Sequence, residues 1–344
     1  MERDDVEIRR TGAGIEYVRT PDERFENLPG HPFEPRYAEV DGLRMHYVEE
    51  GPDGGEIVLL LHGQPTWSYL YRKMIPPLAK AGHRVIAPDL IGMGRSDKPT
   101  SLTIHTLAQH VAWMKSFVER LGLRDVTLFG QDWGSIIGLR CVGENPDLFA
   151  RVMIANGDLP PIPAGVTLFT FPDRATATID ADAPAIDFEG LKQEMFESAN
   201  PLEAFQRWIT FALTSPHFRS SDVVDASTVC SLTREELDAY DAPFPDVRYR
   251  AGPRTLPSMV AGIQGGNDRA WEELGRFEKP FLSIAGEQDG LLGTRAIQDR
   301  LTGHIPGAAG QPHERIEAHH FIQEDAGPLL ADRLDRLIRG TARA

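Results

Sequence analysis

An aspartate flanked by glycines, Gly130-Gln-Asp-Trp-Gly134, is the feature that most constrains the fold of this 344-residue chain. It lies between an apolar strand pattern at Val126–Phe129 and a helical pattern at Ser135–Glu144. Glycines allow a strand and a helix to approach closely, and a tight turn between them lifts the central side chain above the edge of a sheet. The segment therefore predicts a strand–turn–helix unit with Asp132 at its tip. The alternative is that Asp132 only caps the helix.

Strand and helix patterns alternate between about residue 36 and residue 157. Two runs with period-2 alternation meet at Asp41-Gly42 and predict an antiparallel hairpin. Apolar runs and helical periodicities then follow one another, which predicts a doubly wound, mostly parallel sheet of the α/β class. The expected strands are 57–61, 84–87, 126–129 and 152–155, and the expected helices are 70–80, 104–121 and 135–144.

The alternation stops at about residue 158. Residues 158–257 are rich in proline and in short helical patterns, and strand patterns resume at 280–285 and 314–318 before a terminal helix at 328–339. An interrupted sheet of this kind predicts an inserted helical cap, 158–257, within a core formed by 36–157 and 258–344. Residues 1–35 are expected to form an N-terminal surface extension.

Composition narrows the range of partners. A formal net charge of −15 argues against nucleic acid and anionic membranes. Cys141 and Cys230 are too few for a disulfide framework and lie in no metal-type cluster. The charged N-terminus has no apolar leader segment, and no apolar run could span a bilayer. We expect a cytoplasmic protein without cofactor or metal, either a monomer or a weak homo-oligomer.

Aspartate in the nucleophile position has chemical consequences. A carboxylate is ionised at neutral pH and needs no base to attack, but it usefully attacks an electrophilic sp3 carbon and forms an alkyl ester. Asp132 therefore makes peptides and simple esters poor candidates for the substrate.

An alkyl ester needs a base to activate the water that cleaves it. His320 follows the last expected strand, and Asp289 follows the strand at 280–285, in the chain order of nucleophile, acid and histidine. His320 can take a proton from water, and Asp289 can orient the imidazole. The neighbouring His319 and Glu287 are alternatives for these two roles.

Several motifs together resemble the haloalkane dehalogenase family beyond about the first thirty residues. They are the segments 62–74, 89–99, 130–134 and 320–324, with 204–208 and 240–246 in the expected cap. The resemblance implies an α/β-hydrolase fold and hydrolysis of small neutral haloalkanes. It also implies Asp132 as nucleophile, Asp289 as acid and His320 as base.

The same resemblance implies that Trp133 and Trp208 hold the halide, with Trp208 coming from the cap. An indole N–H donates and cannot accept, so two of them suit a developing anion. The backbone N–H groups of Gln64 and Trp133 are expected to form an oxyanion hole, and Phe205 to line the pocket. Two departures from the family pattern are Gln64, where a relative can carry Glu, and His319, which replaces a frequent Gly.

Two other functions use the same residues. An epoxide hydrolase would share the Asp nucleophile but would need acidic donors in the cap, for which Tyr240 and Tyr249 are candidates. A catalytically silent ligand receptor would not need Asp132, Asp289 and His320 together.

Overall fold

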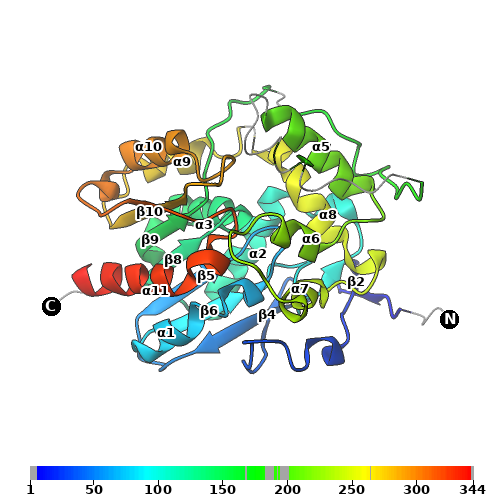
Figure 1. Ribbon diagram of the computed structural model, residues 1–344, viewed down its shortest axis with the longest axis horizontal. Helices are drawn as coiled ribbons and strands as arrows, with labels where there is room; N and C mark the ends of the chain where they lie inside the picture. The colour runs from blue at the N-terminus through cyan, green and yellow to red at the C-terminus, as the bar shows by residue number, and fades with distance from the viewer. Residues whose placement is uncertain are drawn as a thin grey trace.

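An eight-stranded sheet forms the centre of the computed structural model, which describes residues 6–166, 169–182, 190–191, 193, 201–263 and 265–341 (Figure 1). The strand order is β11-β10-β9-β8-β5-β6-β4-β3. Neighbouring strands from β11 to β6 are parallel, whereas β4 runs antiparallel to both β6 and β3. The α/β-hydrolase topology predicted from the sequence, with its N-terminal antiparallel hairpin, is confirmed. The strands are β3 Arg36–Val40, β4 Leu43–Glu50, β5 Ile57–Leu61, β6 Arg84–Pro88, β8 Val126–Gly130, β9 Phe149–Ala155, β10 Phe281–Gly286 and β11 Glu314–Ile316.

The strand order reverses direction between β5 and β8. The chain adds β6 on one side of β5 and then returns to place β8 on the other side, where Leu61 pairs with Gly130. Ligands of open α/β sheets bind outside the carboxyl ends of strands at such a switch point. The residues that follow β5 and β8 therefore meet at the position where a site is expected.

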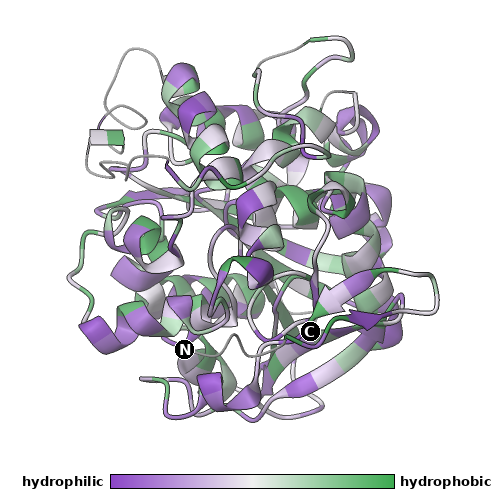
Figure 2. Cartoon of the chain, turned by 90° about the vertical axis from the view of Figure 1, so that its right-hand side faces the viewer, coloured by the Kyte–Doolittle hydropathy of each residue, from purple (hydrophilic) through white to green (hydrophobic). Residues whose placement is uncertain are grey.

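Side chains of the central strands alternate between the two faces of the sheet. Leu59 and Leu61 pack in one buried cluster with α2 (Leu107–Arg120) and α3 (Trp133–Glu144). Val58 and Leu60 pack in the opposite cluster with α1 (Ile75–Lys80) and α11 (Ile322–Thr341). In Figure 2 the outer helices alternate between hydrophobic and hydrophilic residues, as helices that cover a core must.

Helices make up much of the described chain from Pro201 to Leu274, between β9 and β10. They are α5 Pro201–Thr214, α6 Ser220–Asp225, α7 Arg234–Asp241, α8 Ala251–Thr255 and α9 Asp268–Leu274; α10 Arg295–His304 follows β10. In Figure 1, α5, α6 and α8 gather on one side of the molecule, away from α10 and α11. The boundaries of the cap at residues 158 and 257 stay a prediction from the sequence.

Four helices differ from the prediction. The helix expected over 70–80 is a short 3-10 segment, Ser68–Tyr71, followed by α1, because Pro76 and Pro77 have no N–H and are suited to a helix start. The terminal helix begins at Ile322, with non-helical angles at Ala326 just before Pro328. Neither α9 nor α10 was predicted.

The N-terminal residues form a small sheet and pack on the body of the protein. Strands β1 (Arg9–Arg10) and β2 (Glu16–Val18) join β7 (Lys98–Pro99) in this sheet. Phe25 then packs edge-on against Trp67, with ring centroids 5.6 Å apart. Across the described residues, no helix is both long and apolar enough to cross a membrane.

Candidate active site

Asp132 sits at the turn between β8 and α3 in a strained backbone conformation. Its φ of 51° and ψ of −130° lie where residues other than glycine rarely occur. Two glycines make this turn possible. A Cβ on Gly134 would overlap the carbonyl oxygen of Leu61, and a Cβ on Gly63 would overlap the Asp132 carboxylate. The ends of β5 and β8 are therefore packed as closely as the sequence motif predicts.

His320 lies between two carboxylates. Its Nδ1 is 2.9 Å from Oδ2 of Asp289, and its Nε2 is 3.7 Å from Oδ2 of Asp132. Asp289 follows β10, and its Oδ1 also accepts the backbone N–H groups of Leu291 and Leu292 at 2.9 and 3.0 Å. Three residues predicted from separate parts of the sequence therefore come together in one row.

The surroundings shift the pKa values of these groups in different directions. Burial raises the pKa of Asp132, while His320 and the backbone N–H groups of Trp133 and Gln64 favour its carboxylate form. Burial would also raise the pKa of Asp289, but His320 and two backbone N–H groups hold it below the usual range. Burial lowers the pKa of His320, but Asp289 and Asp132 outweigh it and raise the pKa above its ordinary value.

Two backbone N–H groups converge on the Asp132 carboxylate. Gln64 donates to Oδ1 at 2.7 Å from the turn after β5, and Trp133 donates from the first residue of α3. The Gln64 side chain points elsewhere, since its Nε2 donates to the carbonyl oxygen of Pro253 at 3.1 Å. The donor pair expected as an oxyanion hole is therefore present as geometry, with the Gln64 side chain bound to α8.

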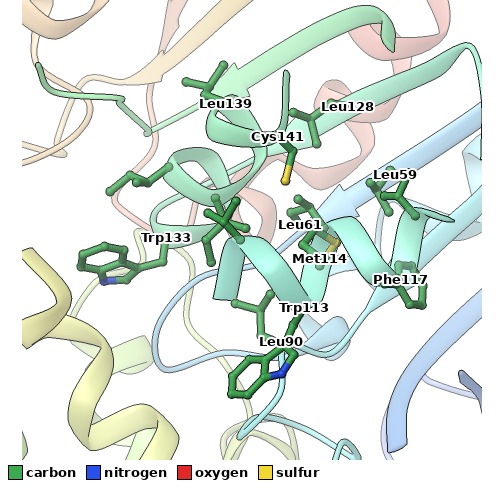
Figure 3. Packing of buried hydrophobic residues seen from close by; sticks show 14 of the residues in the cluster. Leu59, Leu61, Leu90, Trp113, Met114, Phe117, Leu128, Trp133, Leu139 and Cys141 are labelled. Atoms are coloured by element: carbon green, nitrogen blue, oxygen red, sulfur yellow. The ribbon is translucent and has the colours of Figure 1, made fainter. Parts of the chain in front are cut away.

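A pocket of about 250 Å³ opens above Asp132. Trp133, Trp208 and Phe205 all line it, and Figure 3 places Trp133 at the margin of the buried cluster around Leu61. The remaining lining is predominantly apolar and includes Ile136, Pro160, Ile162, Phe169, Leu191, Leu202, Val223, Pro257, Val260, Ile263, Leu291, Leu292 and Phe321. Such a wall favours a small neutral substrate.

The alternative residues for each role lie elsewhere among the described residues. Glu287 is exposed, whereas Asp289 is buried against His320. His319 is buried, and its Nδ1 accepts the backbone N–H of His320 at 2.7 Å. Tyr240 donates to Glu324, and neither it nor Tyr249 is among the described residues that line the pocket.

Asn156 and Gln131 hold this site together and were not predicted from the sequence. The Nδ2 of Asn156 donates to the carbonyl oxygens of His319 and His320 at 2.7 and 3.1 Å, and its Oδ1 accepts the N–H of Gly286 at 2.7 Å. Gln131 donates through Nε2 to the carbonyl oxygen of His320 at 3.1 Å. Their position directly after β9 and β8 was the available signal.

Comparison with known proteins decides the family. The α/β-hydrolase fold family matches residues 56–327. A haloalkane dehalogenase of Mycobacterium marinum is 48% identical over 330 residues, which cover 93% of this chain and 99% of the relative. This chain belongs to the haloalkane dehalogenase family. A haloalkane dehalogenase of Psychrobacter cryohalolentis is 41% identical, with coverage of 96% and 100%.

A solved structure agrees with this assignment. The haloalkane dehalogenase of Paraglaciecola agarilytica, described as tetrameric, superimposes with a TM-score of 0.76 and 31% identity, and the match covers 93% of this chain and 97% of that one. The resemblance drawn from the sequence motifs is thus confirmed, as is the expected enzyme class, a hydrolase acting on carbon–halide bonds.

Proposed function

We propose that this haloalkane dehalogenase hydrolyses small neutral haloalkanes to alcohol, halide and a proton, through an alkyl ester on Asp132. The observation that carries the proposal is the row of Asp132, His320 and Asp289 beneath an apolar pocket lined by Trp133 and Trp208.

The first step is a displacement at carbon. Oδ2 of Asp132 attacks the carbon that bears the halogen, the carbon–oxygen bond forms, and the carbon–halogen bond breaks with its electron pair leaving on the halide. Trp133 and Trp208 line the pocket, where indole N–H donors would stabilise that anion as it develops. The step needs no base because the carboxylate attacks as such.

The second step is hydrolysis of the ester. His320 Nε2, on the Asp132 side of the ring, takes a proton from water as the hydroxyl adds to the ester carbonyl carbon. Charge develops on the carbonyl oxygen, Oδ1, to which the N–H of Gln64 already donates, and the N–H of Trp133 faces the same carboxylate. The intermediate collapses, and the alkoxide leaves as alcohol with the proton that the His320 imidazolium gives up; Asp289 stabilises that imidazolium while it exists. The carboxylic acid formed on Asp132 loses its proton to solvent, which restores the carboxylate.

The test is trapping of the ester. In a His320→Phe variant we expect a single burst of halide from 1-bromobutane and an enzyme whose mass increases by one butyl group. A His319→Phe variant is the matched control and should turn over. Asp132→Ala should release no halide. Halide release that survives in Asp132→Ala would refute the proposed nucleophile, and ester trapped only by His319→Phe would move the base to that residue.

Styrene oxide tests the epoxide hydrolase alternative. The buried contact between Tyr240 and Glu324 argues against a phenol that protonates an epoxide in the pocket. We therefore expect bromide from 1-bromobutane and 1,2-dibromoethane, and no diol from styrene oxide. Diol without halide would reverse this assignment. A cytoplasmic location and a monomeric or weakly oligomeric state remain predictions.

A further inference from the structure

Asp158 is an ionisable residue in the pocket wall for which the reaction has no use. Besides Asp132 and His320, it is the one other ionisable side chain among the described residues that line the pocket. It stands just after β9, and its side chain is only 6% exposed. A carboxylate next to a site that releases halide requires an explanation, because two negative charges in one apolar pocket repel each other.

Arg300 neutralises this carboxylate from outside the pocket. The guanidinium of Arg300, on α10, is paired with Oδ2 of Asp158, while Oδ1 accepts the N–H of Leu159 at 2.8 Å. The Arg300 side chain is 38% exposed, so the cation reaches the buried carboxylate from the solvent side. Burial raises the pKa of Asp158, and Arg300 opposes that effect.

Asp158 is also joined to the nucleophile turn. Its backbone N–H donates to Oγ of Ser135 at 3.0 Å, and that hydroxyl donates to the carbonyl oxygen of Asp132 at 2.6 Å. These two hydrogen bonds place the Asp158 backbone beside the nucleophile turn. The two charges of the ion pair lie at different distances from an anion in the pocket, because Asp158 is part of the pocket wall and Arg300 lies behind Asp158.

We propose that the Asp158–Arg300 pair determines how tightly this enzyme holds its halide product, with Asp158 weakening and Arg300 strengthening the binding. This inference rests on the proposed function, since the anion concerned is the leaving halide. Asp158 favours halide release after the displacement, and Arg300 limits that repulsion so that the halide can still form.

Because Asp158 and Arg300 carry opposite charges, removing one or the other should change bromide affinity in opposite directions. Asp158→Asn removes the repulsion and should tighten bromide binding about threefold to tenfold, and Arg300→Gln should weaken it by a similar factor. The double variant should return to within about twofold of the wild type. A purely structural ion pair would instead make both single variants change in the same direction.

Bromide affinity is measured through quenching of tryptophan fluorescence in the full-length enzyme, since Trp133 and Trp208 line the pocket. Glu144→Gln is the matched control. It breaks two other ion pairs, with Lys115 and Arg140, at the opposite end of α3 from Trp133, and should leave bromide affinity unchanged. Shifts of the same sign in the two single variants, or none above twofold, would overturn the proposal.

Arg300→Lys separates charge from geometry and covers the case in which Asp158→Asn does not fold. If the charge matters, Arg300→Lys should keep bromide affinity near that of the wild type while Arg300→Gln loses it. Equal losses in both variants would overturn the proposal. Halide release from 1-bromobutane by the wild type is measured alongside. Its absence would refute the proposed function, whereas its presence with unchanged bromide affinities in the variants would refute only the role of the ion pair.

Discussion

Replacing Asp289 by Asn should block the second step of the reaction and leave the first intact. Oδ1 of Asp289 accepts two backbone N–H groups, from Leu291 and Leu292, and Oδ2 faces Nδ1 of His320 at 2.9 Å. An asparagine must place its carbonyl oxygen where the two N–H groups point, because its amide nitrogen cannot accept them. The NH2 group then faces Nδ1 of His320.

That orientation selects the wrong tautomer of the imidazole. Nδ1 of His320 has to accept a hydrogen bond, so the proton of the neutral ring moves to Nε2, which is the atom that should take a proton from water. The variant also loses the negative charge that stabilises the imidazolium. A serine-protease triad loses about ten-thousandfold in turnover on the same acid-to-amide change, and we expect a loss of roughly a thousandfold to ten-thousandfold here.

The displacement should survive because Asp132 attacks without a base. We expect halide release in the first turnover to stay within about tenfold of the wild type, with the alkyl ester then accumulating. Rapid-quench halide assays separate the two steps, and mass spectrometry of the quenched enzyme detects the ester. Glu287→Gln is the matched control at the exposed neighbouring acid.

Two results would refute this reasoning. Steady-state turnover of Asp289→Asn within tenfold of the wild type would mean that the tautomer of His320 does not depend on this contact. Ester that accumulates in Glu287→Gln, and not in Asp289→Asn, would assign the acid role to Glu287.

Three further changes test other parts of the site. Burial lowers the pKa of His320, but Asp289 and Asp132 raise it by more in the free enzyme. Ester hydrolysis needs the neutral ring, so its rate should fall as pH drops through the pKa of His320 in the ester form, which lies below that of the free enzyme because the ester removes the charge of Asp132; a single-turnover pH profile checks this. Gly63→Ala should displace Asp132 and lower kcat/KM by more than about a hundredfold, whereas Gly54→Ala, where a Cβ meets nothing within 4 Å, should not change it. Trp208→Phe should weaken bromide binding about tenfold or more in a quenching titration, because a donor to an anion is lost.

The sheet could be predicted from the sequence because its strands are buried on both faces. A run such as Ile57–Leu61 must be apolar at every position, and Asp41-Gly42 fixes the hairpin before it. The N-terminal strands β1 and β2 were missed since they are two and three residues long and depend on β7, far along the chain, for their pairing. Such short strands carry no periodic signal.

The residues of the site differ in the same way, since some are encoded by neighbouring residues and others depend on contacts with distant ones. Asp132 was predictable because its turn is encoded locally by Gly130 and Gly134. Asn156 and Asp158 act through residues more than twenty positions away in the sequence, Asn156 on the His320 segment and Asp158 on Arg300. Side chains of this kind become recognisable only once the strand order brings the loops together.

The hydrogen bonds of the two acids explain why Asp132, rather than Asp289, is suited to be the nucleophile. Both oxygens of Asp289 are engaged, one by two backbone N–H groups and the other by Nδ1 of His320, and its pKa is held low. Asp132 accepts backbone donors, but among the described residues the nearest charged partner of Oδ2 is Nε2 of His320 at 3.7 Å, beyond hydrogen-bond distance. Oδ2 of Asp132, which has no hydrogen bond to the histidine at this distance, is the better placed nucleophile of the two, because its electron pair does not have to leave that hydrogen bond before attacking carbon. The pKa of Asp132 is raised and that of Asp289 is lowered on either side of one histidine, which supports our proposal that Asp132 attacks and Asp289 orients the imidazole.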